Sequence, residues 1–146
     1  MALFLIVITA VACAGHAQES RSRTPADLAP CPDSPNCVST KSEDTARAMP
    51  PLPYLKSDEE SMDRLVSIVR EMKRATIVSA TPSYLHAEFR SALFRFVDDV
   101  EFVLDHSARV IHFRSASRTG YYDFGVNRRR MQEISDRYLR AAEKGG

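Results

Sequence analysis

Residues 83–116 read SYLHAEFRSALFRFVDDVEFVLDHSARVIHFRSA, and this stretch decides the fold. Three parts of it, residues 83–91, 99–105 and 109–116, alternate between apolar and polar side chains with the period of two that is typical of β-strands. Because the connections are short and each strand has one apolar face, we expect an antiparallel meander packed against helices. The β-rich segment 76–80 supplies a further strand before them.

The turn at residues 105–108 (DHSA) sets the expected register of the last hairpin. If its middle two residues form the turn, Glu101 lies opposite His112. Asp99 lies opposite Arg114 in the same register. Such cross-strand pairs contribute about 0.2–1 kcal/mol each, and a slip by one residue would move these polar groups to the core face.

Two helices flank the strands in the sequence. The first is predicted over residues 58–73, because residues 57–60 (SDEE) have the form of a capping box and apolar residues follow at helical spacing. The second begins near Asn127, which is a reasonable N-cap, and carries an apolar stripe to residue 141. The sequence therefore predicts an α+β fold, an antiparallel four-stranded sheet with two flanking helices in the order α-β-β-β-β-α.

The amino-terminal residues have the pattern of an export signal. Residues 1–11 (MALFLIVITAV) are apolar and uncharged, and small residues follow as far as Ala17. We expect residues 1–17 to be a cleaved signal peptide and the protein to be periplasmic or secreted. No Lys or Arg precedes the apolar run, so a retained anchor or a mis-called start is the alternative. Residues 10–13 (AVAC) loosely resemble a lipobox, and membrane association is expected only if Cys13 carries a lipid.

Two cysteines, Cys31 and Cys37, follow the signal. An even pair separated by five turn-forming residues, in an oxidising compartment, indicates a disulfide. A metal site would need further ligands at a matching spacing, and a redox-active pair would have C-x-x-C spacing. No metal or other cofactor is expected.

The segment before the first helix is rich in proline. Residues 18–56 contain seven of the eight prolines, so little regular structure is expected there. We expect residues 18–30 to be a flexible leader and residues 31–142 to form a single α+β domain, with its amino-terminal arm stapled by the disulfide.

Length and charge limit the class of protein. A chain of 146 residues with 44% hydrophobic and 27% charged residues is typical of one soluble globular domain. Its 20 Lys and Arg nearly balance its 19 Asp and Glu, and a formal net charge of +1 gives no support to nucleic-acid binding. Motifs of serine hydrolases, zinc proteases, P-loop NTPases and dinucleotide-binding enzymes are absent.

The polar face of the sheet is the first candidate site. It comprises His86, Glu88, Arg90, Asp99, Glu101, His112 and Arg114. An antiparallel sheet ordinarily leaves one face solvated, and ion pairs across strands explain this pattern. The alternative is a hydrolase-like enzyme that uses His86, His112 and Glu101 for acid–base chemistry.

The second candidate site is residues 114–130, RSASRTGYYDFGVNRRR, where five arginines surround two glycines and a helix start. Helix amino termini and arginine forks both favour anions. The expected ligand-binding residues are Arg114, Arg118, Tyr121, Asp123, Asn127 and Arg128. Alternatively, the arginines are solvated or paired with acidic residues such as Asp123 and Glu133.

Three stretches, residues 31–40 (CPDSPNCVST), 96–102 (FVDDVEF) and 114–130, together resemble the domain of unknown function 1499 family. The resemblance covers about residues 30–140 and carries no catalytic residues over to this chain. Members occur in bacterial exported or membrane-associated proteins and in plastid proteins, and the resemblance implies that the arginine-rich loop is a family feature.

We therefore expect an exported domain that binds an anionic small molecule or an envelope protein through Arg114–Arg130. No nucleic-acid partner is expected. The hydrolase-like enzyme and a structural accessory protein are the alternatives.

Overall fold

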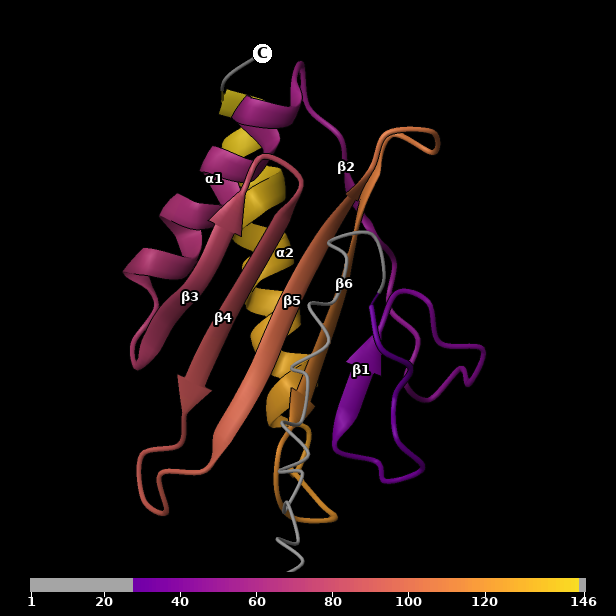
Figure 1. The fold of residues 1–146 in the computed structure, drawn as a ribbon, viewed down its shortest axis with the longest axis vertical. Coiled ribbons are helices and arrows are strands. Elements are labelled where there is room, and N and C mark those ends of the chain that lie inside the picture. The colour runs from indigo at the N-terminus through magenta and orange to yellow at the C-terminus, as the bar shows by residue number, and fades with distance from the viewer. Residues whose placement is uncertain (1–27, 145–146) are drawn as a thin grey trace, which may run out of the picture.

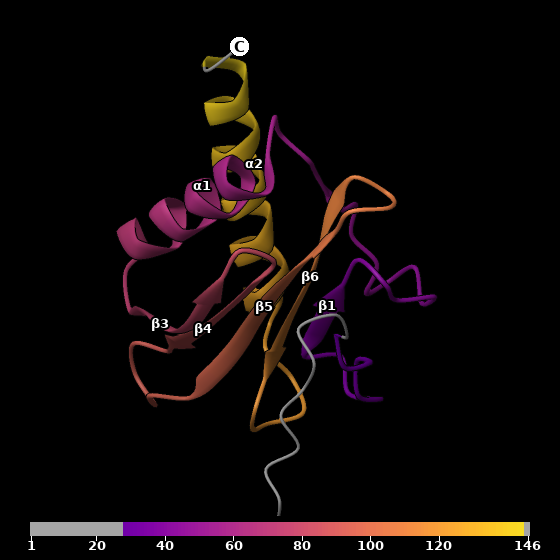
Figure 2. The ribbon, with the colours of Figure 1, turned by 45° about the horizontal axis from the view of Figure 1, so that its top comes forward.

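The computed structural model describes residues 28–144, which form an α+β architecture. The strands are β1 (Cys37–Ser39), β2 (Leu52–Pro53), β3 (Ala75–Thr81), β4 (Tyr84–Arg90), β5 (Val97–Asp105) and β6 (Val110–Ser117). The helices are α1 (Asp58–Glu71) and α2 (Val126–Lys144). All strand pairs are antiparallel in the order β1-β6-β5-β4-β3, and β2 also pairs with β6. Both helices cover one face of the sheet (Figures 1 and 2), so the expected fold class is confirmed.

The core lies between the helices and the alternating apolar face of the sheet. Its largest fully buried side chains are Tyr138, Phe102, Phe113, Leu52, Leu65, Leu85, Ile111, Met131, Ile134, Val69 and Val100. The period-two pattern predicted these faces correctly, since Leu85, Ala87 and Phe89 of β4 are all buried.

Helix α1 begins as its capping box predicts and ends two residues early. The Ser57 hydroxyl accepts a hydrogen bond from the Glu60 amide at 3.1 Å. At the other end Met72 is extended, and Arg74 has a φ of 62°. This left-handed residue turns the chain into β3, so the helix cannot reach Lys73.

The register predicted for the β5–β6 hairpin is wrong by two residues. Glu101 lies opposite Arg114 and not His112. Asp99 lies opposite Ala116 and not Arg114. A shift of two residues leaves every side chain on its expected face, and the core prediction survives for that reason.

The turn of this hairpin explains the shift. Asp105 pairs with Val110, which leaves four residues between them instead of two. The Asp105 carboxylate accepts hydrogen bonds at 2.9 Å from the amides of Ser107 and Ala108. Arg109 closes the turn with a φ of 53°, a left-handed conformation usually taken by Gly or Asn. An arginine at this position gives no sequence signal for the longer loop.

The amino-terminal arm is more ordered than its prolines predict, because β1 and β2 both pair with β6. Cys31 and Cys37 form the expected disulfide, with their Cα atoms 5.7 Å apart. Arg47 holds the loop between them, since its guanidinium donates to the carbonyl oxygens of Pro32 and Asp33. Leu28, expected in the leader, is buried.

The predictions of a signal peptide at residues 1–17, of a lipid on Cys13 and of a flexible leader up to residue 27 concern residues outside the described part of the chain. Within residues 28–144, no helix has the length and apolar character needed to cross a membrane.

Candidate functional site

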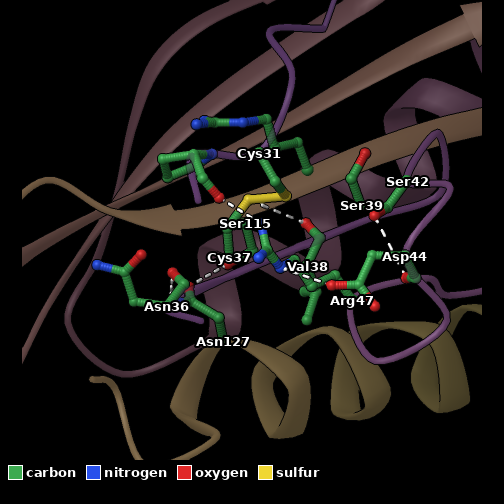
Figure 3. Close-up of a disulfide and its surroundings, with 12 residues drawn as sticks. Cys31, Asn36, Cys37, Val38, Ser39, Ser42, Asp44, Arg47, Ser115 and Asn127 are labelled. Carbon is green, nitrogen blue, oxygen red and sulfur yellow. Dashed lines mark hydrogen bonds and ion pairs between the residues drawn. A yellow bond between two sulfur atoms is a disulfide. The ribbon is translucent and has the colours of Figure 1, made fainter. Parts of the chain in front are cut away.

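Three segments that are distant in the sequence meet where β6 ends and α2 begins. Asn36 comes from the disulfide loop, Asp98 from β5 and Asn127 from α2, and all three are buried. The Asn127 amide group donates to the Asn36 carbonyl at 3.0 Å and accepts from the Ser115 hydroxyl at 2.5 Å (Figure 3). Arg130 donates to Asn127 at 2.8 Å. We call these five residues the Asn127 network.

The Asn127 network contains a buried ion pair. Arg130 Nη2 lies 2.6 Å from Asp98 Oδ2, and both side chains are about nine-tenths buried. The Arg130 guanidinium also stacks over the ring of Phe89, 4.6 Å from its centroid. This pair therefore fixes the start of α2 against β4 and β5.

Asp123 supplies the cap of α2, so the prediction that Asn127 is the N-cap is wrong. The Asp123 carboxylate accepts hydrogen bonds from the amides of Gly125 and Asn127 at 3.0 and 2.9 Å. Gly125 has a φ of 74°, which lets the chain turn sharply into the helix. The protein's own carboxylate thus occupies the helix amino terminus where an anionic ligand was expected.

The anion site predicted from the sequence comprised six residues of one segment. These are Arg114, Arg118, Tyr121, Asp123, Asn127 and Arg128. Of these six side chains, the structure brings only those of Asp123 and Asn127 together, since Asn127 Nδ2 donates to Asp123 Oδ2 at 2.9 Å. Arg114 Nη1 lies 3.5 Å from the Glu101 carboxylate on the outer face of the sheet, whereas Arg128 Nη2 donates to the Ala46 carbonyl in the arm at 2.6 Å. Asp123 and Asn127 serve the fold, and Tyr121 is exposed.

Arg118 belongs to an outer ion-pair cluster of His86, Glu88, Asp99 and Arg118. The guanidinium donates to both Asp99 oxygens at 2.8 Å and to Glu88 at 2.6 Å. His86 Nε2 lies 2.7 Å from Asp99. Burial raises the pKa of Asp99, but the hydrogen bonds from His86 and Arg118 outweigh it and hold that pKa well below its usual value. Two carboxylates therefore already neutralise Arg118.

Glu101 corrects the interpretation of the polar sheet face as fully solvated. Its side chain is only 5% exposed. The Tyr84 hydroxyl donates to Glu101 at 2.9 Å, and the Arg114 guanidinium lies on its other oxygen. The longer side chains of Tyr84 and Arg114 cover the Glu101 carboxylate. The alternation of strand faces predicts only the side of the sheet on which a residue lies, so it could not predict this burial.

The residues of the hydrolase-like alternative have separate partners. His86 belongs to the outer ion-pair cluster, Glu101 bonds Tyr84, and His112 Nδ1 lies 3.0 Å from the Thr40 hydroxyl. Burial and a neighbouring lysine lower the pKa of His112. The three side chains do not form an acid–base pair with one another. Among residues 28–144, no group of three or more His, Cys, Asp and Glu is placed to hold a metal ion.

A cleft of about 650 Å³ lies between the end of α1, the end of β4 and the start of α2. We call it the basic cleft, because six of its lining residues are cationic and two are acidic. It is lined by Glu71, Met72, Lys73, Arg74, Phe89, Arg90, Ser91, Ala92, Val126, Arg129, Arg130, Glu133 and Arg137.

Three cations of the basic cleft have no acidic partner among residues 28–144. Within the described part of the chain, the ion pairs at the cleft are made by the other three cations, Arg90, Arg130 and Arg137. Lys73, Arg74 and Arg129 form none, although Arg74 donates to the Arg90 carbonyl and Arg129 to the Phe124 carbonyl. The cleft therefore keeps a local excess of positive charge in a protein that is nearly neutral overall.

Sequence reasoning missed most of the basic cleft. Of its six cations, only Arg129 and Arg130 lie in the arginine-rich segment, and neither was among the six expected ligand residues. Lys73 was the last residue of the helix predicted over residues 58–73, and Arg74 lay just beyond it, so neither was weighed as a ligand. Arg90 was assigned to the polar face of the sheet. Their convergence depends on the packing of α2 beside α1 and β4.

Two loops expose large apolar side chains at one end of the sheet, residues 91–96 between β4 and β5 and residues 118–125 between β6 and α2. They are neighbours, since Val97 pairs with Arg90 and accepts a hydrogen bond from the amide of Arg118. Both views show them projecting on the same side of the molecule (Figures 1 and 2). The exposed side chains of these aromatic loops are Leu93, Phe94, Phe96, Tyr121, Tyr122 and Phe124.

The segments joined by the Asn127 network are the ones that carry the family resemblance seen in the sequence. No curated protein and no solved structure is significantly similar to the chain. Residues 27–137 match the model of the family described as Protein of unknown function (DUF1499), and the chain belongs to this family.

Proposed function

We propose that this protein is an exported anion-binding domain whose ligand occupies the basic cleft. The observation that carries the proposal is the convergence of Lys73, Arg74 and Arg129, none with an acidic partner among residues 28–144. These cations come from two separate parts of the chain. A ligand that bridges them would offset their mutual repulsion.

The chemistry of the cleft points to a small multivalent anion with an apolar part. Guanidinium groups bind carboxylate or phosphate with paired hydrogen bonds, and a lysine adds a compact charge. Met72 and Val126 supply apolar surface on the cleft wall. A volume of about 650 Å³ suits a ligand of metabolite size.

The proposal is tested by titration calorimetry of the purified protein with inorganic pyrophosphate and with citrate. Replacement Arg129→Gln removes one unpaired cation and is expected to weaken binding about tenfold, because a hydrogen bond to a charged group contributes about 1.5 kcal/mol. The matched control is Lys41→Gln, which removes one exposed cation on the arm and leaves affinity unchanged. Absence of binding of both anions to the wild-type protein contradicts the proposal.

We further propose that the protein is exported to an oxidising compartment and that residues 1–17 are cleaved off during export. The disulfide between Cys31 and Cys37 supports this, because such bonds persist outside the reducing cytosol. Intact mass of protein recovered from the periplasmic or secreted fraction is expected to begin at Gln18 and to be two hydrogens lighter than its reduced form. A mass that retains Met1, or that includes a lipid on Cys13, contradicts cleavage at this position.

A further inference from the structure

The aromatic loops leave their large apolar side chains exposed to solvent. Leu93 is 80% exposed and Phe124 is 82% exposed. A soluble protein seldom gathers so many large apolar groups on adjacent loops unless the patch contacts something.

The backbone of the second loop fixes Phe124 in this outward position. Phe124 has a φ of 53°, a left-handed conformation that is unfavourable for a bulky residue. Asp123 holds the loop by capping α2, and Arg129 Nη1 donates to the Phe124 carbonyl at 2.8 Å. An exposed phenylalanine held in a disfavoured conformation indicates that its outward position serves a contact with another molecule.

The exposed rings of each loop contact one another. Phe94 and Phe96 are stacked with their centroids 5.5 Å apart. Tyr121 lies 6.0 Å from Tyr122, and Tyr122 lies 6.1 Å from Phe124. Each loop therefore presents a preformed aromatic tip.

The basic cleft opens between the bases of these two loops. Ser91 and Ala92, which line it, begin the first loop, and Val126 and Arg129, which also line it, follow the second. Arg95 adds an exposed cation at the first tip. Apolar tips and unpaired cations thus share one end of the molecule.

We propose that this end of the protein docks on an anionic lipid bilayer, with the aromatic tips entering the interface and a lipid phosphate seated in the basic cleft. This inference rests on the proposed anion-binding function and names the ligand class. Tyrosine and phenylalanine suit the headgroup region, and cations beside them are attracted to anionic lipids. A bilayer accepts two separate protruding tips without a matching cavity, whereas a protein partner would need a concave surface for each.

The chain contains no tryptophan, so a single introduced tryptophan reports on one position. The test variants are Phe94→Trp and Phe124→Trp, one in each loop. The control is Leu139→Trp, an exposed position on α2 about 20 Å further along the helix. Each purified protein is mixed with vesicles of phosphatidylcholine, alone or with phosphatidylglycerol, in versions with and without brominated acyl chains.

We expect the emission of both loop tryptophans to shift to the blue and to be quenched by brominated lipid in the anionic vesicles, with no change at position 139. Three unpaired cations near an anionic surface give roughly a hundredfold tighter partition than onto a zwitterionic one. Added pyrophosphate is expected to compete with the anionic vesicles, because it would occupy the same cleft.

Unchanged emission at positions 94 and 124 with every vesicle overturns docking on a bilayer. If pyrophosphate still binds in that case, the anion-binding function stands and the cleft takes a soluble ligand. Equal quenching by anionic and zwitterionic vesicles overturns the role of the cleft as a phosphate seat. If the emission of both loop tryptophans shifts to the blue on addition of a copurified protein and not on addition of vesicles, docking on a bilayer is overturned and the surface belongs to a protein partner.

Discussion

Replacement of Asp98 by alanine is expected to lower the free energy of unfolding by about 3–5 kcal/mol, because it leaves the Arg130 guanidinium buried without its carboxylate. The loss also loosens Asn127, to which Arg130 donates. Urea denaturation followed by circular dichroism measures the change.

A surface ion pair on α2 provides the matched control for this prediction. Glu133 pairs with Arg137 at 2.6 Å, but their side chains are 50% and 35% exposed. Glu133→Ala is therefore expected to cost about 0.5 kcal/mol or less. Similar losses for Asp98→Ala and Glu133→Ala would show that the Asp98 pair is not buried in solution.

Replacement of Phe102 by aspartate is expected to abolish cooperative unfolding. Phe102 is fully buried in the centre of β5 and packs on Phe113, with ring centroids 6.2 Å apart. The substitution removes an aromatic side chain that contributes about 3–5 kcal/mol and places an unpaired charge in the core. Thermal melts followed by near-ultraviolet circular dichroism would show no native baseline.

The control for Phe102→Asp introduces the same charge at an exposed strand position. Val78 in β3 is 53% exposed, so Val78→Asp is expected to change stability by about 0.5 kcal/mol or less. A folded Phe102→Asp protein with a normal melt would mean that the sheet faces are assigned the wrong way round.

The sequence predicted those parts of the fold that depend on local periodicity. The faces of β4 follow from alternation at Leu85, Ala87 and Phe89, which holds whichever strands pair. The Ser57 cap follows from two residues three positions apart. The disulfide was predicted from two nearby cysteines and from the expected export to an oxidising compartment.

The sequence failed where structure depends on an unusual backbone or on distant pairing. The β5–β6 register depends on the left-handed conformation of Arg109, which an arginine in the sequence does not predict. The pairing of Cys37 with Ala116 joins an arm to a strand near the other end of the chain, and proline content predicted an irregular arm. A three-residue strand carries too little periodicity to be recognised alone.

The candidate site shows the same division. The arginine-rich segment contains Arg129 and Arg130, which line the basic cleft. The individual residues were chosen from linear proximity to a helix start. Asp123 occupies that start, and carbonyls or carboxylates of the fold hold Arg118 and Arg128. An arginine stays without an acidic partner when no other strand brings an acid near it. The unpaired arginines are therefore determined by tertiary packing.

The disulfide and the Asn127 network connect the chain over very different spans, and this difference orders events in time. The two cysteines are six residues apart, whereas Asn36 between them bonds Asn127 across 91 residues. A short loop closes at a lower entropy cost than a long one, so the small covalent loop can close before Asn36 meets Asn127. Closure restricts Asn36 in advance and reduces the entropy lost when it finds Asn127. Chains oxidised at these cysteines are accordingly expected to complete their final docking step faster than reduced ones.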